Sequence, residues 1–188
     1  MGELDEERIR SRCGASNWQH FLRTASTAAH LAESAGLDVE KARLAGLLHD
    51  YARSEPRERL VEMAEERGIA VNEVERQTPY LLHGPVGASL VEEELNVHDE
   101  ELLQAIRYHT IGRPGMSPLE KIVYLADMIE PARSFPGVEE IRAAAARSLD
   151  EAFKLAYRRS LEHLLESGKP LHPATVDVWN WLNAERKR

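Results

Sequence analysis

The helical spacing of its apolar residues constrains this chain more than any other feature. Along almost the whole length, apolar side chains recur at steps of three, four and seven residues, as they do on one face of a helix. No segment alternates apolar and polar residues clearly enough to predict a strand. We therefore predict an all-α protein. Its 188 residues, 43% of them apolar, are enough for a substantial core, and we expect a single domain over residues 1–188 with short polar ends.

Cap and turn residues divide the chain into helices. Gly36 is a natural stop for a helix from about Ser16 to Ala35, and Asp38 then caps a second helix that continues to about Tyr51. Proline, glycine and acidic cap residues set the further boundaries in the same way. The remaining expected helices cover about Pro56–Gly68, Pro85–Leu95, Asp99–His109, Ser117–Glu130, Val138–Ser167 and Thr175–Lys187.

Composition excludes several classes of function. With 24 Lys and Arg against 32 Asp and Glu, the net charge of −8 is a poor match for nucleic acid, and the short clusters 158–159 and 186–188 are typical of solvated helix ends. No apolar stretch reaches the ~18–20 residues that span a membrane. The first seven residues lack the basic and apolar regions of a signal peptide, so we expect a cytoplasmic location. The one cysteine, Cys13, leaves only histidine and carboxylate ligands for a metal.

The pair His49-Asp50 is the first candidate for chemistry. It ends the segment 44–48, which is apolar on all sides and therefore typical of a buried helix. Burial of an imidazole beside a carboxylate needs a compensating partner, and the two alternatives are a structural ion pair and a divalent cation. The second such pair, His98-Asp99, opens a helix with an acidic first turn and is better explained as a surface cap.

Other candidate residues lie on separate helices. His20 is off the apolar stripe of its helix but shares an uncharged face with Thr24, Thr27 and Leu31, so it is free to point inward. Asp127 lies at the edge of a buried stripe, where a cation or a basic partner accounts for it better than solvent. The remaining histidines are less informative. His83 and His109 are at helix boundaries and could be caps or functional groups, His30 and His163 have no such context, and His172 stays open.

Several motifs together carry a resemblance to a known family. The order of His20, His49-Asp50 and Asp127 on separate helices resembles the HD-domain superfamily of metal-dependent phosphohydrolases, and within it the bacterial YqeK family. The likeness covers roughly residues 17–182. It rests on the segments LLHDYA at 47–52, LHGPVGA at 82–88, AIRYHT at 105–110, YLAD at 124–127, IEPAR at 129–133 and FPG at 135–137.

The resemblance implies a fold, a reaction and a set of site residues. The fold is an HD-domain helical bundle with a metal site at its centre. The reaction is the symmetrical hydrolysis of diadenosine tetraphosphate to two ADP, with iron as the expected metal. Carried onto this sequence, the metal ligands are His20, His49, Asp50 and Asp127, and the catalytic residues are Asp50, His83 and His109. The implied substrate contacts are His20, Asp50, His83, His109, Thr110, Asp127, Arg133, Pro170, Leu171, His172, Pro173, Ala174 and Thr175.

The chemistry of these residues is consistent with that reaction. Imidazole and carboxylate ligands without thiolate suit iron, manganese or zinc, as one ion or as two with Asp50 between them. Arg133 is suited to phosphate by its planar guanidinium, although it could instead only neutralise Glu130. His83 or His109 would protonate the leaving group. Thr175 is expected to cap the last helix and leave amides free for phosphate.

Some questions stay open at this level. Other HD proteins hydrolyse nucleoside monophosphates or triphosphates or cyclic dinucleotides, and a non-catalytic nucleotide-binding module would keep the same fold. The residues before His20 read Asn17-Trp18-Gln19, where the family usually has an arginine and an aromatic, so a basic contact from this helix is in question. The sequence does not decide metal identity or the choice between a monomer and a homodimer.

Overall fold

The computed structural model describes residues 6–13 and 17–184, and all the regular secondary structure in these residues is helical. The expected all-α class is therefore confirmed, with no strand in the described part of the chain. The elements are α1 (Glu6–Cys13), α2 (Trp18–Ala35), α3 (Val39–Leu48), α4 (Arg57–Glu66), α5 (Glu73–Gln77), the 3-10 helix η1 (Pro79–Leu82), α6 (His83–Leu95), α7 (Glu100–Tyr108), α8 (Pro118–Ile129), α9 (Val138–Ala145), α10 (Leu149–Glu166) and α11 (Pro173–Ala184).

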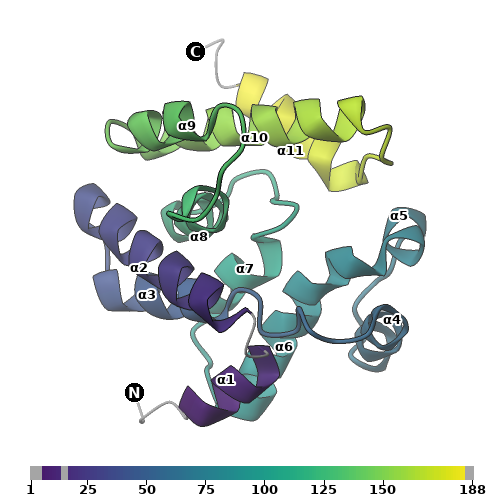
Figure 1. The fold of residues 1–188 in the computed structure, drawn as a ribbon. Coiled ribbons are helices and arrows are strands. Elements are labelled where there is room, and N and C mark those ends of the chain that lie inside the picture. Colours follow the sequence, from purple (N-terminus) through teal and green to yellow (C-terminus); the bar gives the residue numbers. More distant parts are fainter. Residues whose placement is uncertain (1–5, 14–16, 185–188) are drawn as a thin grey trace.

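Helix α8 is central to this arrangement. It packs against α2 and α7 on one side and against α9 and α10 on the other, and α10 with α11 forms an outer layer above it (Figure 1). The apolar stripe expected for this helix is buried, from Leu119 through Ile122 and Val123 to Ile129. Helix α6 packs against α7 and, with η1 and α4, forms the lower part of the molecule.

Several expected helix ends are confirmed by cap geometry. The Asp38 side chain accepts a hydrogen bond from Lys41 N at 2.9 Å, and Asp99 does the same for Leu102 N at 3.2 Å. Gly36 ends α2 in the left-handed conformation that glycine adopts most easily, with φ of 69°. The Ser117 cap of α8 forms a reciprocal capping box with Glu120.

Other helix boundaries were wrong. The pattern expected as one helix over Val138–Ser167 is two, α9 and α10, because the Ser148 side chain accepts a hydrogen bond from Glu151 N and starts a new helix. The last helix begins at Pro173, so Thr175 lies buried in its first turn and is not a cap. Helices α1 and α5 were not expected. The expected first residue Ser16 and last residue Lys187 lie outside the described residues.

The helix expected to reach Tyr51 ends three residues earlier, and this difference matters for the site. Helix α3 stops at Leu48, and the chain continues in tight turns, with Tyr51 N bonded to Leu48 O at 3.1 Å and Arg53 N to Asp50 O at 2.8 Å. His49 and Asp50 therefore lie where the backbone leaves the helix axis. Both side chains are fully buried.

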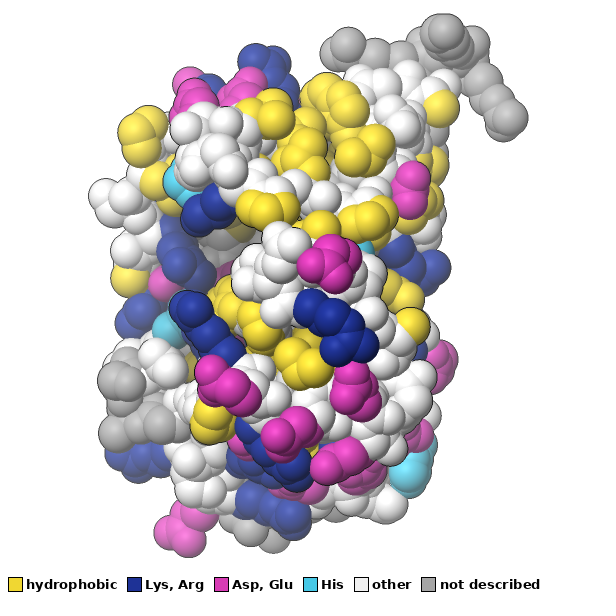
Figure 2. All heavy atoms as spheres, turned by 90° about the vertical axis from the view of Figure 1, so that its right-hand side faces the viewer, with side chains coloured by type: hydrophobic (Ala, Val, Ile, Leu, Met, Phe, Trp, Pro, Cys, Tyr) yellow, Lys and Arg dark blue, Asp and Glu magenta, His cyan; other side chains and the backbone are white. Residues whose placement is uncertain are grey.

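The face toward the viewer in Figure 2 mixes the two signs of charge. Basic and acidic side chains are interspersed over its lower half, and hydrophobic ones gather higher up. Ion pairs on the exposed surface include Arg59 with Glu62 at 2.9 Å and Arg76 with Glu65 at 2.9 Å. Among the described residues, no helix is both long enough and apolar enough to cross a bilayer.

Two glycines allow the helices that carry histidines to approach closely. A Cβ atom at Gly46 of α3 would lie 3.0 Å from Thr24 O of α2, and one at Gly84 of α6 would lie 2.7 Å from Arg107 O of α7. Real Cβ atoms essentially never approach a neighbour as closely as the second distance, and backbone cannot move aside as a side-chain tip can. The close approach at Gly84 thus helps to place His83 beside the end of α7.

Gly84→Ala should therefore destabilise the fold, whereas Gly87→Ala in the same helix serves as the matched control. A Cβ at Gly87 would meet Ala52 N at an ordinary 3.4 Å. We expect Gly84→Ala to lower the free energy of unfolding by about 1–3 kcal/mol through overpacking. Gly87→Ala should leave it unchanged or raise it by up to about 1 kcal/mol, because alanine favours the helix. Urea denaturation of both variants measures this, and equal effects would contradict the role given to the close approach.

Candidate metal centre and active site

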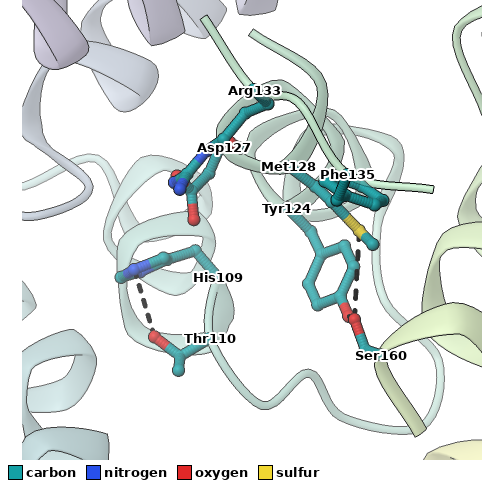
Figure 3. A pocket seen from close by; sticks show the side chains of 8 residues that line it. All are labelled: His109, Thr110, Tyr124, Asp127, Met128, Arg133, Phe135 and Ser160. Carbon is teal, nitrogen blue, oxygen red and sulfur yellow. Dashed lines mark hydrogen bonds and ion pairs between the residues drawn. The ribbon is translucent and has the colours of Figure 1, made fainter. Parts of the chain in front are cut away.

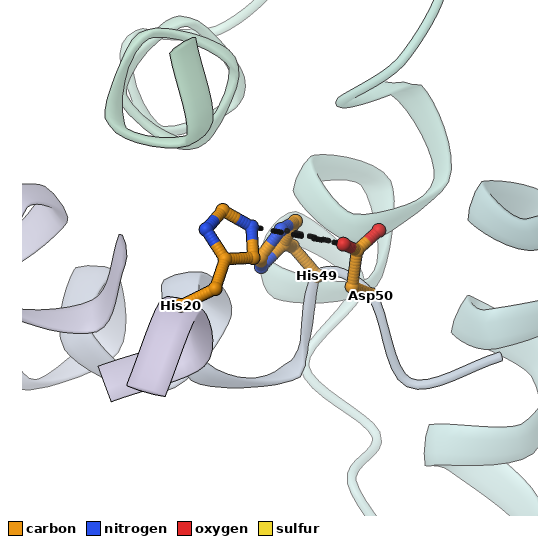
Figure 4. A group of neighbouring side chains, drawn as sticks. All are labelled: His20, His49 and Asp50. Carbon is orange, nitrogen blue, oxygen red and sulfur yellow. Dashed lines mark ion pairs between the residues drawn. The ribbon is translucent and has the colours of Figure 1, made fainter. Parts of the chain in front are cut away.

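Residues from different helices converge on the fully buried Asp50. His20 comes from the first turn of α2, His49 follows α3, His83 begins α6 and His109 follows α7. Figure 4 shows His20 and His49 turned toward Asp50 from their separate elements. The sequence had placed these residues on separate helices, and the fold brings them together at one point.

The two oxygen atoms of Asp50 face different pairs of histidines. Oδ2 lies 3.3 Å from His49 Nε2 and 3.8 Å from His20 Nε2. Oδ1 lies 2.9 Å from His83 Nε2 and 3.3 Å from His109 Nε2. Two groups of potential metal ligands result, one with His20, His49 and Asp50 and the other with Asp50, His83 and His109. Asp50 belongs to both groups, as expected for a bridging carboxylate.

Asp127 lies beside the two histidines of the first group. Its Oδ1 atom lies 3.1 Å from His20 Nε2 and 3.8 Å from His49 Nε2. It is carried by α8, whose buried stripe holds the helix against α2 and α7. Asp127 is thus near two of the residues expected as metal ligands, although the first group, whose ligand atoms lie within 4.8 Å of one another, does not include it.

Hydrogen bonds at Nδ1 orient all four imidazole rings. A carbonyl or carboxylate oxygen only accepts, so each Nδ1 carries the hydrogen and a neutral ring leaves Nε2 with a free electron pair. For His49, His83 and His109 the acceptor is the backbone carbonyl three residues earlier, of Gly46, Tyr80 and Ile106, and for His20 it is the Glu130 carboxylate. The same orientation is typical of histidines that bind a metal through Nε2.

Two of the four Nε2 atoms are unsatisfied in the protein itself. The Nε2 atoms of His20 and His49 are buried and make no hydrogen bond. Their electron pairs face the oxygens of Asp50 and Asp127, so acceptors lie against acceptors at 3.1–3.8 Å. Such an arrangement is unfavourable unless a cation or an added proton lies among the atoms. Imidazole and carboxylate ligands fit a divalent metal of the first transition row, so we describe this group as a divalent metal site.

The carboxyl groups of the site are ionised at neutral pH. Burial raises the pKa of Asp50, whereas the surrounding imidazoles, above all His49, lower it. The imidazoles together have the larger effect, so the net pKa is well below its ordinary value. Burial likewise raises the pKa of Asp127, but His20, His49 and Arg133 together outweigh burial and lower the net pKa. Burial lowers the pKa of His83 more than Asp50 raises it, which keeps that ring neutral. Burial also lowers the pKa of His109, but the carboxylates of Asp50 and Asp127 and the carbonyl of Ile106 together outweigh burial and raise the net pKa.

A pocket of about 250 Å³ opens beside the cluster (Figure 3). One part of its wall is polar and adjoins the metal site, and the other part is aromatic or apolar. Its lining residues are His109, Thr110, Tyr124, Asp127, Met128, Arg133, Phe135 and Ser160. Thr110 Oγ1 lies 3.1 Å from His109 Nε2 and 3.2 Å from His83 Nε2, so the pocket reaches the second ligand group. This shape can accept a charged group at one end and a ring at the other.

Arg133 lies at the polar end of this pocket, where the sequence had suggested it. Its Nε atom donates to Asp127 O at 2.8 Å and its Nη2 atom pairs with the Asp127 carboxylate, while Glu130 Oε1 is 3.9 Å away. Arg133 is therefore paired mainly with Asp127, and not with Glu130 as the alternative supposed. Its side chain is 37% exposed and can reach a ligand in the pocket.

Glu130 and two further arginines were missed as site residues. Glu130 is buried and binds His20 Nδ1 at 3.2 Å, Arg23 Nε at 2.6 Å and Ala132 N at 2.8 Å, so it orients His20. Arg23 shows that α2 does carry a basic residue beside the site, although not before His20. Arg53 donates to Asp50 Oδ2 at 3.0 Å. Its position three residues after Asp50, just beyond the buried helix, was the signal that could have identified it.

The late segment 170–175 does not line this pocket. His172 Nε2 lies 2.7 Å from Asn72 Nδ2 and 3.3 Å from Glu75 Oε1, and His172 Nδ1 accepts from Ala174 N at 3.1 Å. His172 thus supplies the first-turn hydrogen bond of α11 that was expected from Thr175. The expected nucleotide contacts of Pro170, Leu171, His172, Pro173, Ala174 and Thr175 stay a prediction.

The histidines set aside in the sequence lie away from the cluster. His98 is exposed, with Nδ1 3.5 Å from Glu92 Oε1 and Nε2 2.8 Å from Asn96 Oδ1. His30 and His163 are also exposed. They are therefore suitable control positions for substitutions in the cluster.

A crossing of helices around two histidine and aspartate groups is the arrangement of the HD domain, and residues 17–132 match the family model of that domain. The chain belongs to the HD-domain family. More particularly, it is 42% identical over 163 residues to the symmetrical bis(5'-nucleosyl)-tetraphosphatase of Bacillus subtilis (strain 168), with 87% of each chain covered. The protein of the same name from Halalkalibacterium halodurans is 41% identical over 170 residues, with 90% of each covered.

A solved structure agrees with this placement. The crystal structure of a predicted HD superfamily hydrolase involved in NAD metabolism, from Clostridium acetobutylicum, superposes with a TM-score of 0.91 at 37% identity, and 95% of each chain is covered. The relationship that the sequence motifs indicated is therefore confirmed.

Removal of one imidazole should abolish metal binding by the first group without unfolding the chain. We expect His49→Ala to lower the metal content of the purified protein at least about tenfold, because a first-group nitrogen is lost. His98→Ala, at an exposed position, should keep the wild-type content. Elemental analysis gives the metal content, and circular dichroism verifies the helical fold. Equal metal content in both variants would exclude His49 as a ligand.

Proposed function

We propose that this protein is a metal-dependent hydrolase that cuts a bis(5'-nucleosyl) tetraphosphate symmetrically, diadenosine tetraphosphate giving two ADP. The observation that carries the proposal is the Asp50 carboxylate shared by two histidine groups at the end of a pocket that contains Arg133. The names of relatives that cover about nine-tenths of this chain supply the substrate class. Water adds its oxygen to one of the two central phosphorus atoms, and the bridging oxygen leaves with the other ADP and takes up a proton.

The residues proposed to hold the metal are His20, His49, Asp50 and Asp127. Iron is the proposed metal, with manganese or zinc as alternatives, and His83 and His109 would join Asp50 if a second ion binds. When bound, such a metal supplies Lewis acidity and lowers the pKa of water. Orientation of the rings through hydrogen bonds at Nδ1 is the contribution of the chain.

Arginine side chains are proposed to receive the phosphates. Arg133 and Arg53 are each paired with a ligand carboxylate and remain partly exposed, at 37% and 32% of their side chains. Guanidinium groups stabilise the charge that develops on a phosphoryl group in transit. Thr110 can add a hydroxyl contact, and Tyr124 and Phe135 provide ring surfaces for a nucleobase.

His109 is the proposed donor of the proton to the leaving phosphate when a single ion is bound. It lines the pocket, whereas His83 lies behind it, with their Nε2 atoms 3.0 Å apart. A proton on His109 Nε2 could then pass to the leaving oxygen and be replaced through Thr110 or His83.

The proposal also includes a cytoplasmic location, and contacts from residues 170–175 to the second nucleoside, both of which rest on the sequence.

The product pattern tests the reaction directly. Protein purified without oxygen and supplied with iron, manganese or zinc should convert diadenosine tetraphosphate to ADP alone. In ¹⁸O-labelled water, one labelled oxygen should appear in each pair of ADP molecules, measured by chromatography and mass spectrometry. AMP with ATP would overturn the symmetrical cut and favour another nucleotide phosphohydrolase. Binding without turnover under all three metals would favour a regulatory module.

Asp50→Asn should remove activity while the protein stays folded. The amide keeps the shape of the side chain but loses the negative charge that faces both histidine groups. We expect kcat to fall at least about 100-fold. The control is His98→Asn, which changes an exposed histidine and should retain wild-type kcat. Initial rates of ADP formation measure both variants, and normal turnover by Asp50→Asn would remove Asp50 from the mechanism.

A further inference from the structure

Arg142 of α9 holds the backbone of the segment that follows α8. Its Nε atom donates to Ile129 O at 3.0 Å, and its Nη2 atom donates to Glu130 O at 2.8 Å and to Arg133 O at 3.1 Å. The remaining amino group pairs with Glu139 on the same helix. A single guanidinium therefore joins three carbonyls that span the turn between α8 and the pocket residue Arg133.

This turn carries side chains that act at the site. Asp127 lies just before it, Glu130 orients His20, and Arg133 points back to Asp127 at the polar end of the pocket (Figure 3). Arg133 Nε holds the turn from the pocket side through Asp127 O at 2.8 Å, and Arg142 holds it from the opposite side. The position of the Arg133 guanidinium thus depends on a backbone that Arg142 fixes.

The chemistry of arginine suits this task. The last carbonyls of a helix have no partner within the helix, and Ile129 O and Glu130 O are at the end of α8. Arginine presents five N–H donors in a rigid plane, so it can bind several carbonyls at fixed relative positions, whereas lysine offers a single freely rotating ammonium group. Small displacements of a group that binds a phosphate have large effects on rate, so a rigid turn matters there.

We infer that Arg142 is a positioning residue for the nucleotide phosphates, acting through Arg133. The inference rests on the proposed function for its substrate class. It also gives a role in the active site to α9, which lies beyond residues 17–132 that match the HD domain. Arg142 itself does not line the pocket and touches no reacting atom.

A double-mutant cycle tests this dependence. The four proteins are the wild type, Arg142→Met, Arg133→Met and the double variant, with Arg142→Lys as the conservative change. The matched control is Arg158→Met on α10, an exposed arginine paired with Glu162 at 2.8 Å. Calorimetric titration with ADP, the reaction product, in the presence of the metal gives a dissociation constant that does not depend on turnover. The KM and kcat for diadenosine tetraphosphate are then measured with metal present.

The expected result is strong coupling between the two arginines. Arg142→Met should weaken ADP binding about fivefold to tenfold in the wild-type background but less than about twofold when Arg133 is already methionine. KM should rise more than kcat falls, Arg142→Lys should be intermediate, and Arg158→Met should match the wild type. Equal weakening in both backgrounds, or a loss of thermal stability without a change in ADP affinity, would overturn the inference.

The cycle also separates this inference from the proposed function. If the wild type binds ADP with the expected coupling but does not split diadenosine tetraphosphate into ADP, the positioning role stands and the proposed reaction fails. If the reaction is symmetrical but the two arginines contribute independently, the reaction stands and the role of Arg142 fails.

Discussion

The structure depends on a contact that is repulsive without a cation. The carboxylates of Asp50 and Asp127 face imidazole nitrogens whose hydrogens are on the opposite side of each ring. Helices α2, α3 and α8 place these groups together, and their facing acceptors are satisfied only by a cation or by added protons. The fold is stabilised elsewhere, by the buried stripes of α2, α7 and α8, and that stability holds the unfavourable contact in place.

The same local hydrogen bond orients three of the histidines around Asp50. His49, His83 and His109 each follow or begin a helix, and each bonds its Nδ1 hydrogen to the carbonyl three residues earlier. A helix end has carbonyls without intrahelical partners, so an imidazole placed there gains a hydrogen bond and a fixed tautomer from the same contact. His20 lies at a helix start, where such a carbonyl is lacking, and it uses the Glu130 carboxylate instead.

The sequence could predict the helical class, most caps and several of the residues that the fold brings together around Asp50, because these follow from periodicity, local cap chemistry and family motifs. It could not predict which arginine pairs with which carboxylate. Arg53, Arg23 and Arg133 look alike in sequence, and only the crossing of α2, α8 and the turn after α3 decides their partners. The break near Ser148 was missed because the apolar spacing continues across it, and the cap of the last helix was wrong because Thr175 is buried in the first turn of α11.

Charge balance explains how an acidic protein can receive a tetraphosphate. Near the site, Asp50 pairs with Arg53, Asp127 with Arg133, and Glu130 with Arg23, so the protein alone offers no excess of positive charge there. A divalent cation on the same carboxylates would shift this balance and make Arg53 and Arg133 available to an anionic ligand. Glu130 differs from these two carboxylates because it is buried and its hydrogen bond orients His20. Arg23 therefore remains paired with Glu130 and stabilises the position of Glu130 beside His20. The three arginines therefore divide into two that can turn to substrate and one that keeps the metal site in shape.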